Sequence, residues 1–456
     1  IAGLALVWAL LIAAPAGATT TVTERYGPIK MAPYDVARGD EVFNIPKPDV
    51  DGYITRMSAS LVYADGTAVP IANTMLHHVV MLDTGRYLGD KQDPTCDSFR
   101  RFDSRSYLPL RGLRFYGLGE ERHKLLLPDG YGYQTRAADK WAMTYMLMNH
   151  RPTSETVFIQ YRMEIETERE LQPVTPVWLD VRDCNLDPVY DVAGGARKGA
   201  TTTETTTWTA PEAGRIIAAA GHVHGGGKAL VLSKPDCGQT LLRSTPEWGR
   251  RSHPYYQVRP LLHEPGPITT SYTQSAAGFP VAAGERLRLR SIYDAHRPHA
   301  RVMGIMLIGF VADPSVTAKC APLPGDRRTY FTRHDGLRRA PRITVPITRW
   351  DGSGRARVIR RPPGRTVAFA SAPAVDVERF GFHPANIAIR RGRRVRWRFF
   401  DSDLHNVTFA NGPAAFSSDN LDDGGTFTHR FRRPGIYRLM CTLHPVEMAA
   451  TVRVRR

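Results

Sequence analysis

Short apolar or alternating runs, separated by Gly, Pro, Asp and Asn, recur along almost the whole of this 456-residue chain. Examples are "YITRMSASLVYA", "TVFIQYRMEIE", "RLRLRSIYDA", "RVMGIMLIGFVA" and "RRVRWRFF". An apolar repeat of two residues is typical of β-strands that bury one face, whereas the repeat of long amphipathic helices is scarce here. The sequence therefore predicts an all-β chain built from β-sandwiches.

Two breaks in this pattern divide the chain, whose length allows about three domains. The first break, Gly194–Thr207, is poor in large apolar residues and precedes a new strand pattern. The second, residues 316–365, is rich in Arg, Pro and Gly and predicts a basic connector. We therefore expect a first sandwich at 20–195, a second at 205–315 and a third domain at 366–456.

The first residues, "IAGLALVWALLIAAPAGATT", form an apolar run that ends in small residues. With Ala16-Gly17-Ala18 as a cleavage site, residues 1–18 are typical of a secretory signal peptide whose start is missing. A membrane anchor is the alternative, but the run is short for a span and ends in Pro and Gly. We expect a secreted or extracytoplasmic protein, without a transmembrane segment in the mature chain.

Export to an oxidising compartment allows cysteines to pair. The chain has five cysteines, namely Cys96, Cys184, Cys237, Cys320 and Cys441. Joining Cys96 to Cys184 and Cys237 to Cys320 gives each of two domains one bridge, although four cysteines allow three pairings. Cys441 is then left free to bind a metal.

The formal net charge of +17 favours acidic partners, such as cell-surface polymers. Nucleic acid is not an expected partner, because the sequence has no nucleic-acid motif and no interleaving of aromatic and basic residues. Much of the Arg excess lies in residues 326–365 and near the C-terminus, where a solvated basic surface is the simpler interpretation.

Cys441 lies in "RLMCTLHPVEM", together with His444 and Met448, and His405 precedes it in "DLHNVTF". Two imidazoles and a thiolate, with a more distant thioether, are typical ligands of a blue-copper electron-transfer site. This segment resembles the cupredoxins, the plastocyanin and azurin family, and the stretches on both sides resemble their strands. The resemblance implies a Greek-key β-sandwich over 366–456, with one type 1 copper bound by these four residues. A structural sandwich with a buried free cysteine is the alternative.

Three further histidine groups lie upstream, in "NTMLHHVVMLDTG", "MTYMLMNHRPTSE" and "AAAGHVHGGGKALVL". They contain the pair His77 and His78, then His150, and then the pair His222 and His224. Residues i and i+2 of a strand face the same side, so His222 and His224 can share one metal. Adjacent histidines face opposite sides of a regular strand, so the first pair is a weaker signal. Taken singly, each group also has a structural interpretation.

In this order, and followed by "ARVMGIMLIGF", these groups resemble the copper monooxygenases of the peptidylglycine and dopamine β-monooxygenase family. That resemblance implies two successive, jelly-roll-like β-sandwiches with one copper on each. It also implies that O2 is used at the second copper to insert an oxygen atom into a C–H bond. The first copper would be bound by His77, His78 and His150, and the second, catalytic copper by His222, His224 and Met303.

Two departures argue against peptide amidation. The amidating branch has an Arg two residues before the His-x-His pair and a Tyr four residues after the Met, where this chain has Ala220 and Leu307. His296 and His299 are additional, and substrate binding, metal binding and a polar loop are all open for them. A closer likeness, carried by "RFYGLGEERHKLLLPDGYGYQTRAADKWAMTYMLMNHRP" and "HRPHARVMGIM", is to the stress-up-regulated Nod proteins. It supports the fold more than a reaction.

Two functions follow as alternatives. The first is an exported, copper-dependent, monooxygenase-like oxidoreductase with three coppers per chain, in which the cupredoxin passes electrons to the upstream sites. Its partners would be O2 and either a small-molecule reductant or a redox protein. The second is a non-enzymatic copper-binding, electron-transfer or stress-related protein in which only the cupredoxin is redox-active.

Overall fold

The computed structural model describes residues 19–100, 107–109, 112–182, 184–332, 336–371 and 373–456. In these ranges the chain contains strands and two short 3-10 helices but no α-helix, so the predicted all-β fold is confirmed. The expected signal peptide, residues 1–18, lies outside the described residues. No helix in the described ranges is long and apolar enough to span a membrane.

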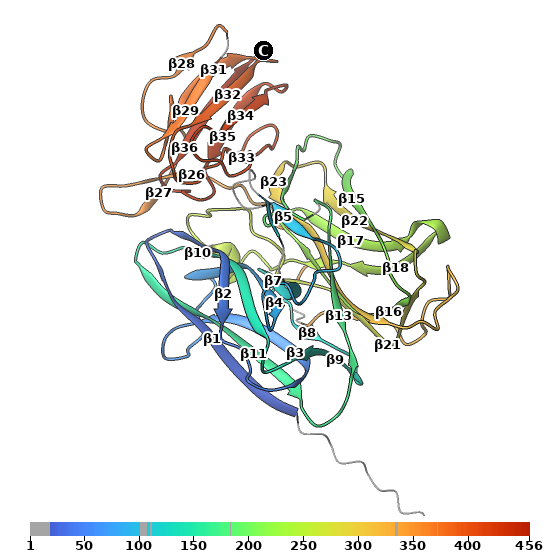
Figure 1. Cartoon of the computed structure of the whole chain (residues 1–456). Coiled ribbons are helices and arrows are strands. Elements are labelled where there is room, and N and C mark those ends of the chain that lie inside the picture. Colours follow the sequence, from blue (N-terminus) through green and yellow to red (C-terminus); the bar gives the residue numbers. More distant parts are fainter. Residues whose placement is uncertain (1–18, 101–106, 110–111, 183, 333–335, 372) are drawn as a thin grey trace, which may run out of the picture.

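Two facing sheets form the first sandwich (Figure 1). One sheet consists, in spatial order, of β1 (Thr19–Met31), β11 (Glu155–Glu166), β3 (Gly52–Val62), β9 (Tyr131–Thr135) and β12 (Gln172–Pro173), with β8 (Leu125–Leu126) also paired to β3. The other consists of β2 (Val36–Ile45), β10 (Lys140–Asn149), β4 (Thr74–Gly85) and β7 (Leu113–Gly119). Trp141, Met143 and Tyr161 are fully buried between the sheets. The outer face of the β2-β10-β4-β7 sheet is therefore free to pack against the next domain.

The second sandwich has the same two-layer plan. One sheet consists of β13 (Thr175–Asp180), β24 (Gly304–Ala312), β16 (Gly214–Val223), β21 (Tyr272–Val281) and β25 (Arg328–Tyr330). The other consists of β15 (Thr201–Thr209), β22 (Arg286–Asp294), β17 (Gly227–Lys234) and β18 (Gln239–Ser244). Its smaller elements are two strand pairs, β14 (Tyr190–Val192) with β23 (His299–Val302) and β19 (Pro246–Glu247) with β20 (Thr269–Thr270), and the 3-10 helices η1 (Pro235–Cys237) and η2 (Pro254–Gln257). A further pair, β5 (Ser98–Arg100) with β6 (Tyr107–Pro109), lies between β4 and β7 in the chain. Phe279, Leu289 and Tyr293 are fully buried in the core.

The first sandwich ends earlier than the sequence predicts. β13 pairs with β24 along its whole length, with Thr175 opposite Phe310 and Asp180 opposite Ile305. The change of sandwich therefore falls after Pro173 and not within Gly194–Thr207. That later segment is poor in large apolar residues because it leads into β15, an edge strand on which no residue is fully buried.

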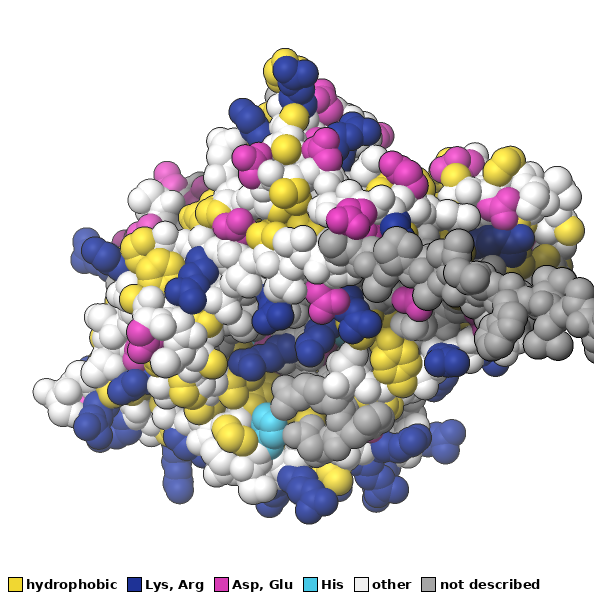
Figure 2. Space-filling model, turned by 90° about the horizontal axis from the view of Figure 1, so that it is seen from below, with side chains coloured by type: hydrophobic (Ala, Val, Ile, Leu, Met, Phe, Trp, Pro, Cys, Tyr) yellow, Lys and Arg dark blue, Asp and Glu magenta, His cyan; other side chains and the backbone are white. Residues whose placement is uncertain are grey.

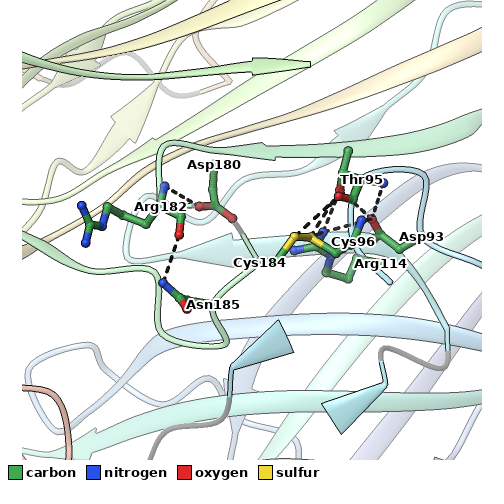
Figure 3. Close-up of a disulfide and its surroundings, with 8 residues drawn as sticks. All are labelled: Asp93, Thr95, Cys96, Arg114, Asp180, Arg182, Cys184 and Asn185. Atoms are coloured by element: carbon green, nitrogen blue, oxygen red, sulfur yellow. Dashed lines mark hydrogen bonds and ion pairs between the residues drawn. A yellow bond between two sulfur atoms is a disulfide. The ribbon is translucent and has the colours of Figure 1, made fainter. Parts of the chain in front are cut away.

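The two disulfides join Cys96 to Cys184 and Cys237 to Cys320. Because Cys184 follows β13, the first bridge connects the two sandwiches (Figure 3), whereas one bridge inside each domain was expected. Beside this bridge, Arg114 Nε donates a hydrogen bond to Asp93 Oδ2 over 2.7 Å, and the amide of Cys96 donates to Asp93 Oδ1 over 3.2 Å. The disulfide thus joins the two sandwiches covalently, and the Arg114–Asp93 ion pair holds the Cys96 side of it in place.

The third domain is also a two-sheet sandwich, and Trp397, Phe431 and Leu439 are buried in its core. One sheet consists of β28 (Val367–Ala368), β31 (Asn386–Arg390), β36 (Ala449–Arg455), β35 (Gly435–Met440) and β33 (Thr408–Asn411). The other consists of β30 (Gly381–His383), β29 (Ala374–Glu378), β32 (Arg394–Phe399) and β34 (Thr426–Arg430). β31 runs parallel to β36, and β29 runs parallel to β32, so the chain crosses between the sheets.

The expected connector, residues 316–365, has more structure than its composition predicts. It supplies β25 to the second sandwich and then forms a hairpin of β26 (Ile347–Trp350) and β27 (Ala356–Ile359). This segment also contains apolar residues, and the side chains of Val345 and Ile347 are buried against the third domain.

The third domain rests on the two sandwiches (Figure 1). Ser417 donates from its amide to Asp191 Oδ2 over 2.7 Å, and Arg433 Nη1 donates to the carbonyl oxygen of Gly194 over 2.8 Å. Val446 is fully buried in an apolar cluster that also contains Met148 of the first sandwich. The domain is therefore docked by both polar and apolar contacts.

Basic side chains are spread over the surface, as the net charge of +17 requires. Figure 2 shows Lys and Arg over much of one face, densest along its lower edge, with acidic side chains mostly in the upper half.

Candidate metal centres

The four residues expected to bind copper in the third domain lie at one end of its sandwich. His405 precedes β33, Cys441 follows β35, and Met448 immediately precedes β36, so that the loop between β35 and β36 carries three of the four. His405 Nδ1 is 3.1 Å from His444 Nδ1, and Cys441 Sγ is 3.7 Å from the same His444 atom. The Met448 side chain is fully buried in the adjoining core.

Neighbouring groups hold these side chains in place. His405 Nε2 lies 2.8 Å from the Asp401 carboxylate, which leaves Nδ1 directed at His444. The amide of Asn406 donates a hydrogen bond to Cys441 Sγ over 3.3 Å. Burial raises the pKa of the Cys441 thiol, so a metal ion is the natural means of keeping this sulfur deprotonated. Burial and the adjacent His405 lower the pKa of His444 to about 4, which leaves a neutral imidazole ready to bind a metal.

Upstream, five histidines from both sandwiches meet where the two domains pack, and we call them the interdomain histidine cluster. They are His77, His78, His222, His224 and His263. His78 Nε2 is 3.2 Å from His222 Nε2 and 3.1 Å from His224 Nε2. Both histidine pairs of the two expected ligand sets thus lie in one cluster at the domain interface.

A β-bulge explains how both members of the first pair enter this cluster. On β4, His78 pairs with Met146 and Leu76 pairs with Leu147, so His77 is an extra residue in the register. A bulge inserts one residue and turns its side chain to a new direction. The ring centroids of His77 and His78 are consequently 4.0 Å apart. In a regular strand these adjacent side chains would point to opposite faces of the sheet.

The second pair behaves as its spacing predicts. His222 is on β16, Val223 points into the core, and His224 follows, so both imidazoles face the first sandwich. The close approach of His222 depends on Gly119 of β7, because a Cβ at that position would lie 2.5 Å from His222 Cε1.

The hydrogen bonds on the outer side of these rings fit a metal site. His224 Nδ1 donates to the carbonyl oxygen of Arg301 over 2.9 Å, and His222 Nδ1 lies 3.0 Å from Glu121 Oε2. Both contacts place a proton on Nδ1, so Nε2 of each ring faces His78 and offers its lone pair whenever that ring is neutral. His78 Nε2 can offer a single proton to these two acceptors, whereas a metal ion accepts from several nitrogens at once.

Two buried carboxylates that sequence reasoning missed lie in the turn after β7. Glu120 Oε1 is 2.8 Å from His77 Nδ1 and 2.6 Å from His263 Nε2. Burial alone would raise the pKa of Glu121, but the charge of His222 and its hydrogen bond lower it to about 2. Burial likewise opposes protonation of His222, but Glu121 outweighs it and raises the pKa of His222. The signal in the sequence was "GEERH", in which two adjacent acids stand between a strand and a histidine.

His263 was also missed, because it stands alone in an irregular segment between η2 and β20. His150 lies at the edge of the cluster, with its ring centroid 6.3 Å from that of His263. The ring of His150 is buried, and neither of its nitrogens forms a hydrogen bond with the described residues. Burial and the nearby His263 lower its pKa to about 3, so the ring is neutral.

The other candidate residues have different surroundings. Met303 is buried, packs against Trp178 and Ile305, and lines a pocket together with His78 and His222. His299 is buried with Nδ1 2.8 Å from Glu264 Oε2, whereas His296 is exposed and its Nδ1 lies 2.9 Å from the carbonyl oxygen of Ala196. His296 and His299 are thus held by structural partners outside the cluster.

A cavity of about 440 Å³ lies between the cluster and the third domain. Its walls include His77 and His224 from the cluster, and Thr442 and Leu443 from the loop that carries Cys441. The histidine cluster and the loop that carries Cys441 therefore face a common space.

Two protein families match separate parts of the chain. Residues 147–314 match the family Stress up-regulated Nod 19. Residues 370–455 match the copper binding proteins of the plastocyanin/azurin family. Both matches agree with the resemblances drawn from the sequence motifs.

Two individual relatives each match part of the chain. The chain is 29% identical over 153 residues to a probable copper-dependent oxygenase M1 from Phoma sp., which is 32% of this chain and 36% of that protein. It thus spans little more than a third of the length of that relative. It is 30% identical over 89 residues to amicyanin-alpha from Methylorubrum extorquens, which is 18% of this chain and 75% of that protein.

Two solved structures each match a small part of the chain. A reduced amicyanin mutant is 26% identical, covering 18% of this chain and 82% of that chain with a TM-score of 0.18. A purple cupredoxin from Nitrosopumilus maritimus is 26% identical, covering 18% of this chain and 99% of that chain with a TM-score of 0.17. Through residues 370–455, which follow a region that matches Stress up-regulated Nod 19, the chain belongs to the plastocyanin/azurin family of copper-binding proteins.

Proposed function

We propose that this chain is an extracytoplasmic, copper-dependent oxidoreductase in which the cupredoxin passes electrons to copper held by the interdomain histidine cluster. The observation that carries the proposal is the convergence of Nε2 atoms from His78, His222 and His224, contributed by two domains, beside a docked cupredoxin. Likeness to a protein described as a probable copper-dependent oxygenase supports the same view.

Bound copper would supply one-electron redox chemistry in the cupredoxin and the reduction of O2 at the cluster. In the proposed reaction, one oxygen atom of O2 enters a substrate C–H bond to give an alcohol. The other atom leaves as water, which takes up two protons and two electrons. The electrons come from a small-molecule reductant or a redox protein and enter through the cupredoxin one at a time.

The residues around the ligands keep the geometry constant while electrons move. Asp401 and the Asn406 amide hold the cupredoxin side chains, and Glu121 and the Arg301 carbonyl hold those of the cluster. Fixed ligands reduce the rearrangement that accompanies electron transfer. The proposed ligands are His405, Cys441, His444 and Met448 in the cupredoxin, and His77, His78, His150, His222, His224 and Met303 upstream.

Stopped-flow spectroscopy tests this proposal. The reduced, copper-loaded chain should regain its blue absorption when mixed with O2, and His222→Ala should abolish this rapid recovery while leaving the blue site intact. The same recovery rate with and without His222 would show that the cluster does not accept electrons from the cupredoxin.

A second candidate function is copper binding and electron transfer without oxygen chemistry. The observation that favours it is that His78 Nε2 is within hydrogen-bonding distance of both His222 and His224, so the cluster can close without a metal. Copper counting separates the two candidates, because the first requires copper upstream of residue 316 and the second can function with one blue copper per chain.

A further inference from the structure

A small pocket lies directly beside the interdomain histidine cluster, between the outer faces of β4 and β24. Its volume is about 90 Å³, and His78, His222 and Met303 form part of its wall. The rest of the wall is mostly apolar and consists of Val80, Leu82, Leu118, Met146, Trp178, Leu186, Ile305 and Leu307, with a few polar residues. A molecule in this pocket would therefore touch three of the proposed copper ligands and little polar surface.

Each charged side chain along this pocket is already neutralised by a partner. Arg114 donates to Asp93 over 2.7 Å and also covers the ring of Trp178. Glu121 is paired with His222 at 3.0 Å, and Asp187 is paired with Arg301. A charged group entering the pocket would lose its water and find no counter-charge, which costs several kcal/mol.

Strand geometry accounts for the apolar character of the pocket. On β4, Val79 and Met81 fill the core of the first sandwich, so Val80 and Leu82 face outward with His78. On β24, Met306 and Ile308 fill the second core, so Ile305 and Leu307 face outward toward the same space. Packing between the sandwiches buries Leu82 and Ile305, whereas Val80 and Leu307 stay half-buried, so they leave apolar surface beside the pocket.

The larger cavity on the cupredoxin side differs from this pocket. It has a volume of about 440 Å³, and Arg297, Arg301 and Arg342 contribute to its wall. A cavity of that size with charged walls favours water more than a small, mostly apolar pocket does. The apolar pocket is thus the better place for a C–H bond that must be oxidised in the absence of competing water.

We propose that the group oxidised by this protein is an uncharged alkyl or aryl group that binds in the pocket between Val80, Leu307 and Met303. This inference rests on the proposed function and names the substrate class for the same site. An engineered apolar cavity of about 150 Å³ binds benzene. A pocket of about 90 Å³ that adjoins an interdomain space therefore suits one ring or a short branched chain, with the rest of the substrate outside.

Three probes that share a ring and differ in charge test this inference, namely toluene, benzoate and benzylammonium. Binding to the copper-loaded full chain is measured by calorimetry. Toluene should bind at least tenfold more tightly than either ion. Val80→Phe fills the pocket from a half-buried position and should weaken toluene binding at least tenfold. Val358→Phe, on an exposed face of β27, is the matched control and should leave binding unchanged.

A second variant keeps the test decisive if Val80→Phe does not fold, as judged by circular dichroism and the blue band. Leu307→Gln adds a polar group without bulk and should also weaken toluene binding. Equal or tighter binding of benzoate or benzylammonium would overturn the inference, and so would toluene binding that neither variant changes. These outcomes are separate from failure of the proposed function, which depends on reoxidation by O2 and not on ligand binding.

Discussion

His78 on β4 and His222 on β16 lie with their Nε2 atoms 3.2 Å apart, although 144 residues separate them in the chain. This contact links the first sandwich to the second at the point where the proposed upstream copper ligands meet. It makes the site a property of the domain interface, so its integrity depends on how the sandwiches pack as well as on the ligands.

The first prediction concerns this shared site. His78→Ala and His222→Ala should each remove copper from the same centre, because their nitrogens converge on one point. We expect each variant, and the double variant, to lose the same number of coppers per chain, measured by elemental analysis of dialysed protein. The blue centre serves as an internal control and should stay fully occupied. Additive losses in the double variant would show two independent sites.

The second prediction concerns the cupredoxin. Cys441→Ser should abolish the intense visible absorption near 600 nm, because that band arises from charge transfer between a cysteine thiolate and copper. The fold should persist, since Cys441 is the one unpaired cysteine and a serine of similar size fills its place. Absorption and circular dichroism spectra of the copper-loaded variant check this. A blue band in the variant would exclude Cys441 as a ligand.

The third prediction concerns Glu121, whose carboxylate holds His222 by Nδ1. Glu121→Gln removes the charge and should weaken copper binding at the cluster by about 10- to 100-fold, the usual effect of losing such a partner. Glu264→Gln is a matched control, because Glu264 holds His299 outside the cluster in the same way. Competition with a copper chelator measures both affinities. Equal affinities in the two variants would contradict the role given to Glu121.

Much of this organisation is readable from the sequence. Alternating runs such as "RVRWRF" become β32, on which Val395, Trp397 and Phe399 are buried and the Arg residues are exposed. The ligand spacing in the loop after β35 is local, so a pattern of residue types is sufficient to recognise it. The same holds for His222 and His224, because residues i and i+2 of a strand point to the same face of the sheet.

The remaining features depend on long-range packing. The β-bulge at His77 is set by the register between β4 and β10, which no local pattern specifies. Glu120 and His263 are 143 residues apart and meet only when both sandwiches are in place. The assignment of β13 to the second sandwich has the same origin, since its partner β24 lies more than 120 residues later.

The fourth prediction uses the two disulfides as a matched pair, with sequence separations of 88 and 83 residues. By chain entropy each bridge should stabilise the folded state by a similar amount, about 4.6 kcal/mol. Only Cys96–Cys184 joins the sandwiches, so replacing both of its cysteines by Ala should weaken copper binding at the cluster. Replacing Cys237 and Cys320 should lower the melting temperature comparably but leave that affinity unchanged. Calorimetry and chelator competition measure these effects, and equal affinities would contradict the interface argument.

The last prediction concerns how electrons reach the cluster. A flexible connector would act by raising the effective concentration of the cupredoxin near the cluster. In the structure, however, the cupredoxin is docked, and its Ser417 is hydrogen-bonded to Asp191 of the second sandwich. Ser417→Asp places two carboxylates side by side, and such a like-charge contact costs several kcal/mol. It should slow recovery of the blue band by O2 at least tenfold, while Ser417→Asn, which has the same shape without the charge, should slow it far less.

The reduction potential and absorption spectrum of the blue centre should match in the two variants, because Ser417 is not a ligand. Stopped-flow traces at low ionic strength provide the measurement, and salt should partly restore the rate of Ser417→Asp by screening the repulsion. Identical rates in both variants would mean that docking at this surface does not control electron transfer and that the cupredoxin serves another partner.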